Sequence, residues 1–427
     1  MSTATAPASP ARTPRNYARW RAATLVLVHV LIGLHIAHWL VAGATLAPLE
    51  FNEVVYTLEL GLVTAGFLLM VTAVLATAIV GRFFCGWACH ILALQDLCAW
   101  LLGKLGIAGK PIRSRTLRTA PWVVMGYMFV WPQLTRLWQG RPAPALHTAG
   151  PDEAWASFVT SEFWRNLPGP WITGLTFLVC GFLIVHLLGS RAFCQSACPY
   201  GVLFGLADRF APGRIRLRGT CTDCGKCTAV CQSGIWVHEE VQRFGNVVDP
   251  QCLRDLDCVA ACPEQALAYG FGKPSGLSSL VTSGRRRRGW HWPLGQDLLA
   301  GAAMLGGIVA FRGLYDSVAF LMAVGMGCLL AGFVVLGLRM RTAGDLTWRG
   351  LVLRTRGRLS GKGRLVALLL TAAFLFTLHS GYVRWHEWRG GVAFAAARAR
   401  LDAGDRDGAR PFVGEAIAHH GVVEQWG

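Results

Sequence analysis

Residues 221–231 of the chain read CTDCGKCTAVC, and residues 252–263 read CLRDLDCVAACP. The first stretch has the spacing C-x2-C-x2-C-x3-C, which is typical of proteins that bind a 4Fe-4S cluster, because short turns aim the thiolates at one cubane. The second stretch keeps three cysteines of this spacing and has Asp255 where another would stand. Together they predict a ferredoxin-like α+β module over residues 211–275 that folds around two iron–sulfur clusters.

In modules with two such runs, the fourth cysteine of each run serves the cluster of the other run. We therefore expect two crossed ligand sets. The first consists of Cys221, Cys224, Cys227 and Cys262, and the second of Cys231, Cys252 and Cys258. The second cluster is completed either by Asp255 or by a non-protein ligand, in which case the carboxylate faces solvent. A carboxylate binds cluster iron more weakly than a thiolate, so a three-iron form of this cluster is within reach.

A second cysteine pattern occurs twice ahead of this module. Residues 82–89 read RFFCGWAC and residues 191–198 read RAFCQSAC, so both follow R-x-F-C-x2-A-C. Each copy follows an apolar run, which indicates a duplicated two-helix unit. Cysteines four residues apart share one face of a helix. Four thiols are therefore candidates for one composite site, namely Cys85, Cys89, Cys194 and Cys198.

Several chemistries are open to these four thiols. They could hold a metal ion, a further cluster or a redox-active disulfide, and soft thiolates also suit Cu(I). The plain alternative is that they are small buried side chains at helix ends. Cys98, Cys180 and Cys328 lack partners at metal-ligand spacing, so we expect them to be packing residues.

The chain as a whole is too apolar for an ordinary soluble protein. Its 427 residues are 53% hydrophobic and 15% charged, whereas about a quarter of the residues in soluble proteins are charged. Apolar runs long enough to cross a bilayer occur at about 22–42, 60–80, 120–137, 171–189, 317–338 and 365–383, with a weaker one at 294–311. The expected fold class is a multi-pass α-helical membrane protein of about seven spans, with the ferredoxin-like module inserted as a cytoplasmic domain.

Basic residues give the orientation of the chain. Its net charge is +17, and in polytopic proteins Lys and Arg collect in cytoplasmic loops. Arg19 and Arg21 precede the first span, and the run Arg285–Arg288 precedes the fifth. We therefore expect the N-terminus and residues 191–292 on the cytoplasmic side of a bacterial inner membrane. Basic clusters beside spans usually serve topology, so no nucleic-acid partner is expected.

The predicted organisation has five parts. They are a disordered cytoplasmic N-terminus (1–19), a four-span membrane unit with both C-x3-C motifs (20–210), the cluster module (211–275), a three-span membrane unit (285–389) and a periplasmic helical tail (390–427).

His29 lies on the first predicted span, and four further histidines lie in or near the spans. They are His35, His38, His186 and His379. Ionisable side chains inside a membrane are costly and commonly functional. A pair on facing helices would ligate haem, whereas a single histidine would bind a quinol head group or a neighbouring helix. We regard these four as quinol or haem candidates.

With both motifs in view, the chain resembles the polytopic ferredoxin-type 4Fe-4S membrane proteins of the NapH, NosR (membrane half) and CcoG superfamily. The resemblance covers roughly residues 60–270 and rests on the paired C-x3-C elements ahead of the double ferredoxin run. Two residues depart from the family pattern. His90 stands where these proteins usually have proline after the first C-x3-C, whereas Pro199 keeps it in the second copy, and Asp255 replaces a cluster cysteine.

The resemblance implies a leading hypothesis of electron transfer. Electrons would pass between the quinol pool or a cytoplasmic donor and a periplasmic redox partner or respiratory metalloenzyme, with the chain acting as a quinol-dehydrogenase-type subunit. The alternative is a copper reductase or assembly factor for a respiratory metalloenzyme, with the C-x3-C thiols as ligands. A third hypothesis is a scaffold whose clusters are structural.

Overall fold

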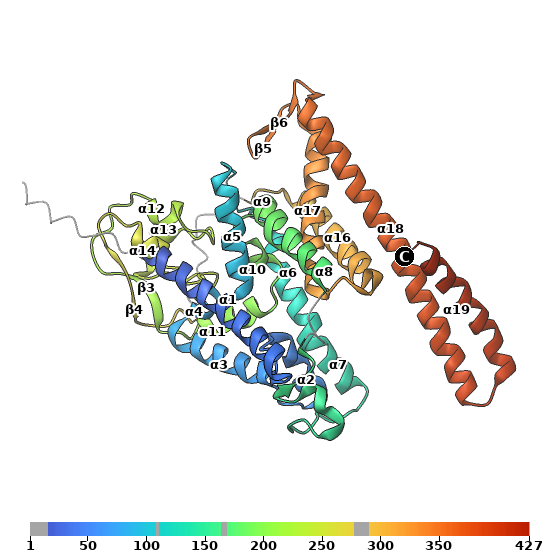
Figure 1. Cartoon of the computed structure of the whole chain (residues 1–427). Helices are drawn as coiled ribbons and strands as arrows, with labels where there is room; N and C mark the ends of the chain where they lie inside the picture. The colour runs from blue at the N-terminus through green and yellow to red at the C-terminus, as the bar shows by residue number, and fades with distance from the viewer. Residues whose placement is uncertain (1–15, 108–110, 164–168, 277–289, 427) are drawn as a thin grey trace, which may run out of the picture.

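Long apolar helices form the body of the molecule (Figure 1). The computed structural model describes residues 16–107, 111–163, 169–276 and 290–426. Among these residues, five helices are long and apolar enough to cross a membrane. They are α1 (Tyr17–Ala42), the continuous segment from α8 (Pro170–Thr176) through η5 (Phe177–Leu183) to α9 (Ile184–Leu188), α16 (Leu294–Phe311), α17 (Phe320–Thr342) and α18 (Gly361–Asp402). The chain is a mostly helical transmembrane protein.

Two further predicted spans are helical but shorter or less apolar. α3 (Ala65–Val80) has 16 residues, which corresponds to ~24 Å of helix against a hydrocarbon core of ~30 Å. The other consists of α6 (Arg115–Met125), the π-helical η2 (Gly126–Val130) and α7 (Trp131–Trp138). Polar residues such as Gln133 and Arg136 reduce its apolarity. The total of seven spans therefore stays a prediction.

Both C-x3-C copies are built from the same succession of helices. The preceding helix ends at Gly81 in one copy and at Gly189 in the other, and their φ values are 84° and 121°. Glycine adopts positive φ without steric cost, so each helix stops there. The next helices are α4 (Phe83–Trp87) and α5 (His90–Lys104) in the first copy, and α10 (Ala192–Ser196) and α11 (Tyr200–Asp208) in the second.

The cysteine-rich module has the expected α+β composition. β3 (Gly213–Leu217) pairs antiparallel with β4 (Leu267–Phe271). Its helices are short, namely α12 (Lys226–Ala229), α13 (Val237–Phe244) and α14 (Asp257–Ala260). The hydroxyl of Tyr269 donates a hydrogen bond of 3.0 Å to the carbonyl oxygen of Val80, so the module is attached to the end of α3.

The remaining elements are short. β1 (Thr45–Leu46) pairs with β2 (Val159–Thr160), and β5 (Leu346–Trp348), β6 (Leu351–Thr355) and β7 (Arg358–Leu359) form a small antiparallel sheet. The others are η1 (Phe51–Glu53), α2 (Val54–Leu60), η3 (Pro151–Ala156) and η6 (Leu314–Asp316).

The C-terminal region forms a long helical hairpin. α18 runs for 42 residues, or ~63 Å, and α19 (Arg406–Trp426) folds back along it, away from the rest of the molecule (Figure 1). The tail from residue 390 is helical, but α18 carries the helix of the last predicted span into it without a break. The polar residues after 383 remain helical because α19 packs on them and buries small residues such as Ala393 and Ala397.

The start of the chain also differs from the prediction. Residues 17–19 were expected to be disordered but form the first turn of α1. Tyr17 packs against the buried core of the cysteine-rich module, which explains the order at this point. Residues 1–15 and the run Arg285–Arg288 lie outside the described residues.

The largest buried core lies where α6, η5, α9, α10, α16 and α17 meet. Cys180 and Cys328 belong to it, with 4% and 0% of their surface exposed, and Cys98 is fully buried in a smaller cluster. These three cysteines are packing residues, as predicted.

Candidate metal centres

The first expected ligand set surrounds one cavity. Its four cysteines, Cys221, Cys224, Cys227 and Cys262, line a cavity with about 350 Å³ of empty space. Apolar side chains of Val241 and Leu267 line the same cavity. Cys227 is buried whereas Cys224 is exposed, so the site reaches the surface on one side. A group of four thiols around a partly closed apolar cavity fits a cubane cluster.

The backbone of the first cysteine run is repeated in the second. Asp223 and Gly225, which flank Cys224, have φ values of 57° and 68°. Arg254 and Leu256, which flank Asp255, have φ values of 57° and 64°. Positive φ is unusual for a residue such as leucine, so the repeat reflects a common loop shape rather than local preference. Asp255 therefore occupies the structural place of Cys224.

The second expected set is also brought together, with Asp255 among its cysteines. Burial, followed by the charge of the Asp255 carboxylate, raises the pKa of Cys231 and of Cys258. Cys252 lies in the same electrostatic neighbourhood. When these thiols are deprotonated they and the carboxylate repel one another, and the iron of a cluster would offset that repulsion.

Asp255 does not face solvent. Only 6% of its surface is exposed, and its Oδ2 lies 3.7 Å from Nη1 of Arg21, a residue of α1. The alternative of a solvated carboxylate was therefore wrong. The same guanidinium lies 3.2 Å from the Asp257 carboxylate and 3.5 Å from Asp96. Arg21 thus links the first membrane helix to the loop that carries Cys252 and Asp255, which we call the second cluster loop.

The thiols of the two C-x3-C copies lie close to one another, which is what one composite site requires. Burial raises the pKa of Cys198 to about 12, and the next largest causes are the neighbouring thiolates of Cys89 and Cys85. Burial likewise raises the pKa of Cys194, with Cys89 and Cys198 next. The four thiols are therefore within electrostatic reach of one another. Over the described ranges, no group of three or more His, Cys, Asp or Glu side chains has the arrangement of a single-ion site.

The first copy of the motif is in direct contact with the second cluster loop, and the second copy contacts the segment that follows Cys231. A Cβ atom on Gly86 would lie 2.2 Å from the carbonyl oxygen of Leu253, so this glycine allows the loop to approach Cys85. Nε1 of Trp87 donates to the carbonyl oxygen of Arg254 at 2.9 Å. In the other copy, Nε2 of Gln195 donates to the carbonyl oxygen of Ser233 at 2.9 Å. The thiol site and the second cluster site are thus adjacent.

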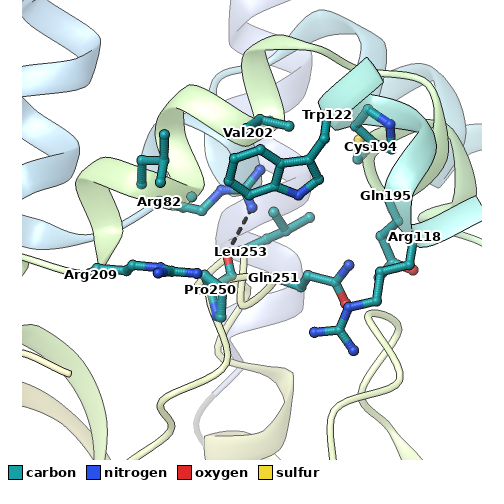
Figure 2. Close-up of a pocket in the computed structure, with 14 residues that line it drawn as sticks. Arg82, Arg118, Trp122, Cys194, Gln195, Val202, Arg209, Pro250, Gln251 and Leu253 are labelled. Atoms are coloured by element: carbon teal, nitrogen blue, oxygen red, sulfur yellow. Dashed lines mark hydrogen bonds between the residues drawn. The ribbon is translucent and has the colours of Figure 1, made fainter. Parts of the chain in front are cut away.

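A cleft opens beside this contact (Figure 2). It contains about 540 Å³ of empty space and is lined by Arg82, Trp122, Cys194, Arg209 and Pro250 among others. Nη1 of Arg82 donates to the carbonyl oxygen of Pro250 at 2.8 Å, the dashed line in Figure 2. Nε of Arg82 and Nε of Arg209 are buried and have no partner among the described residues.

The motif arginines are candidate site residues that the sequence analysis did not single out. Nη1 of Arg191 lies 2.5 Å from Oδ1 of Asp96, and Nη2 of Arg82 lies 3.8 Å from the sulfur of Cys85. The charge of Arg191 also opposes the rise in the pKa of Cys194, so both guanidinium groups bring positive charge to the thiols. Their repetition at the first position of R-x-F-C was the signal that could have found them.

The four candidate histidines are not gathered at one site. His35 and His38 contact β1, through the carbonyl oxygen of Leu46 and the hydroxyl of Thr45, both at 2.9 Å. His186 packs edge-on against the Trp348 ring, and Nε2 of His379 lies 3.3 Å from the hydroxyl of Tyr315. These contacts bring no two of the four into a haem-type pair, and a quinol role for any of them stays a prediction.

Two protein families match the chain. The 4Fe-4S binding domain matches residues 62–108 and again 171–218, which are the two C-x3-C copies with their preceding helices. The 4Fe-4S dicluster domain matches residues 213–263, which hold both cysteine runs of the module. No solved structure matches the chain.

Among curated proteins, YccM of Escherichia coli (strain K12), named for electron transport, is 26% identical over 61% of this chain and 78% of its own length. The methylamine utilization ferredoxin-type protein MauN of Methylobacillus flagellatus is 31% identical, over 39% of this chain and 56% of its own length. The ferredoxin-type protein NapH of Haemophilus influenzae is 27% identical, over 49% of this chain and 68% of its own length. The chain is similar to the NapH-like membrane ferredoxin-type 4Fe-4S proteins.

The matched domains and the apolar helices make the chain a ferredoxin-type, iron–sulfur membrane protein that is similar to electron transport proteins. The match to MauN spans little more than half of that protein. The electron donor, the electron acceptor and the direction of electron flow are therefore matters of proposal.

Proposed function

We propose that the chain is an electron-transfer subunit that connects membrane quinol, or a cytoplasmic donor, with a periplasmic respiratory redox partner. Bound iron–sulfur clusters would supply one-electron transfer. The protein itself would hold the binding sites in a fixed sequence that leads from the surface of the module to the membrane helices. The observation that carries the proposal is the close approach of Gly86 to the Leu253 carbonyl, because it joins the thiol site to the module.

The first ligand set is the site nearest to the surface. Cys224 is exposed, and the cavity is open on its side. A soluble cytoplasmic protein could therefore exchange electrons there. The second ligand set lies deeper, since Cys252 and Cys258 are both buried, and it adjoins the membrane helices through Arg21 and Trp87.

The site at the opposite end consists of the four C-x3-C thiols, and we call it the inner centre. We propose that they bind a further iron–sulfur cluster rather than a single ion. The match of the 4Fe-4S binding domain to both copies supports a cluster. The arginines Arg82 and Arg191 would lower the cost of holding several thiolates away from water.

The cleft beside Cys194 is the proposed position of the quinol head group. Trp122 offers an aromatic face, and the unpartnered Nε atoms of Arg82 and Arg209 offer hydrogen bonds to quinone oxygens. This position replaces the histidines as our preferred quinol contact, because Cys194 itself lines the cleft.

Iron analysis and EPR of anaerobically purified protein test the proposal. We expect about twelve irons per chain for three 4Fe-4S clusters and about eight in Cys89→Ala. Cys98→Ala is the matched control, because Cys98 is a packing cysteine and should keep all the iron. A quinol analogue should reduce the centres of the wild type. Equal iron in wild type and Cys89→Ala, or no reduction by any quinol analogue, would contradict the proposal.

Copper loading is the second candidate function, because four neighbouring thiols are soft ligands. It predicts one copper per chain that is lost in Cys89→Ala while the iron content stays at about eight. Measuring both metals in the same preparation therefore separates the two functions.

A further inference from the structure

The C-terminal hairpin carries a pair of histidines that the electron-transfer proposal does not use. His386 lies on α18 and His419 on α19, and the two helices pack along each other (Figure 1). The two Nδ1 atoms share a hydrogen bond of 2.8 Å, and the ring centroids are 4.8 Å apart. A metal ion bound by both Nδ1 atoms would displace the proton of this hydrogen bond. We propose that this pair binds a divalent transition-metal ion of the copper class, through both Nδ1 atoms.

The separation of the two nitrogens fits ligands in neighbouring corners of a tetragonal site. Two nitrogens that are each ~2.0 Å from an ion and lie at a right angle are ~2.9 Å apart, whereas tetrahedral ligands would be ~3.3 Å apart. The observed 2.8 Å is close to the first arrangement. Square-planar or tetragonal nitrogen and oxygen ligation is typical of Cu(II) and Ni(II).

A carboxylate stands on the far side of one imidazole. Oε1 of Glu415 lies 3.8 Å from Nε2 of His419, and Arg389 forms an ion pair with the same carboxylate. Histidines that bind metal commonly direct their other ring nitrogen to a carboxylate, which fixes the tautomer and the ring orientation. At 3.8 Å the Glu415 carboxylate makes no hydrogen bond, but its charge favours a proton on Nε2 and leaves Nδ1 as the ligand.

Aromatic rings hold both imidazoles in place. Trp385 packs edge-on against His386 and against His419, with centroids 4.8 Å and 5.5 Å away. Tyr382 lies 4.5 Å from His386 on another side. Such packing restricts ring rotation, so the ligands are arranged before an ion binds.

The protein would supply only two ligands to this ion. Within the described parts of the chain, no third His, Cys, Asp or Glu completes a single-ion site here. The other coordination positions are left to water or to an exchangeable ligand, as in sites that react with or release their ion rather than store it. The predicted topology places the pair beyond the outer end of the last span. The inference does not depend on the clusters.

EPR of the purified full-length protein with Cu(II) tests the site. We expect about one bound Cu(II) per chain whose spectrum shows coupling to imidazole nitrogen. The same spectrum recorded for His386→Ala identifies any signal that arises because Cu(II) oxidises the clusters or the thiols. Labelling histidine with nitrogen-15 should change the coupling pattern without any mutation.

Variants assign the ligands. His386→Ala and His419→Ala should each abolish the nitrogen-coupled signal, whereas His420→Ala, a change at the adjacent histidine, should keep it. Glu415→Gln, which keeps both ligands, should weaken binding about 10–100-fold. A signal that survives in both single histidine variants, or a wild-type spectrum that histidine labelling leaves unchanged, would overturn the proposal.

Discussion

The contact between Gly86 and the Leu253 carbonyl gives the sharpest prediction. In Gly86→Ala, the new Cβ would lie 2.2 Å from the oxygen, whereas ordinary contact begins at 3.4 Å, so the two must separate by about 1.2 Å. Overpacking of this kind costs about 1–3 kcal/mol. Alanine recovers ~1 kcal/mol of helix propensity, so the free energy of unfolding should fall by roughly 0–2 kcal/mol.

The main effect should be on electron transfer rather than on folding. The displaced carbonyl belongs to the loop that carries Cys252, and the helix that is pushed away carries Cys85. We expect Gly86→Ala to keep the iron content of the wild type but to reduce its inner centre several-fold more slowly. Rapid freeze-quench EPR after mixing with a reductant measures this rate directly.

A matched variant separates this contact from a general effect of replacing glycine. Gly103 lies in α5, and a Cβ there would meet nothing within 4 Å. Gly103→Ala should therefore transfer electrons at the wild-type rate. If Gly86→Ala also transfers at that rate, with its full iron content, the close approach is not the route between the two sites and the reasoning fails.

Three other predictions concern the membrane topology, the C-x3-C thiols and Asp255. Reporter fusions after Ser275 and after Gly390 should report the inside and the outside of the membrane, and an inside result at Gly390 would show that a span was miscounted. Cys85→Ser and Cys194→Ser should each lose the inner centre, with little further loss in the double variant, because ligands of one site act as a unit; additive losses would mean two independent sites. Mild oxidation should give a three-iron EPR signal from one cluster, which Asp255→Cys suppresses with all iron retained; a signal of equal size in Asp255→Cys would exclude a labile iron at this residue.

Local sequence patterns were sufficient for the cysteine runs and for the membrane character. The residues of C-x2-C-x2-C are so close in the chain that their spacing alone brings three thiols to one cavity. Apolar run length likewise identified the five long helices. Prediction was poorer at the C-terminus, where α18 continues past residue 383 without a break. The helix continues because α19 packs on it, and a hydropathy pattern does not show which elements pack together.

The surroundings of Asp255 could not be predicted, for a related reason. The spacing identified the residue as the substitute for a cluster cysteine, but an acidic side chain in a loop is ordinarily solvated. Its burial depends on Arg21, a residue of the first membrane helix. The charge that compensates the carboxylate thus comes from a part of the chain more than two hundred residues away.

The sequence by itself determined the kinds of chemistry available to this protein: thiols at cluster spacing, a duplicated thiol motif and a membrane-spanning body. These features depend on neighbours in the chain or on average polarity, which the order of residues specifies directly. Only the tertiary structure decided how the sites are joined, through Gly86 against Leu253, Arg21 against Asp255, and His386 against His419. Each of these pairs meets because helices and loops that are distant in the chain pack together. Such contacts produce no repeating pattern in the sequence.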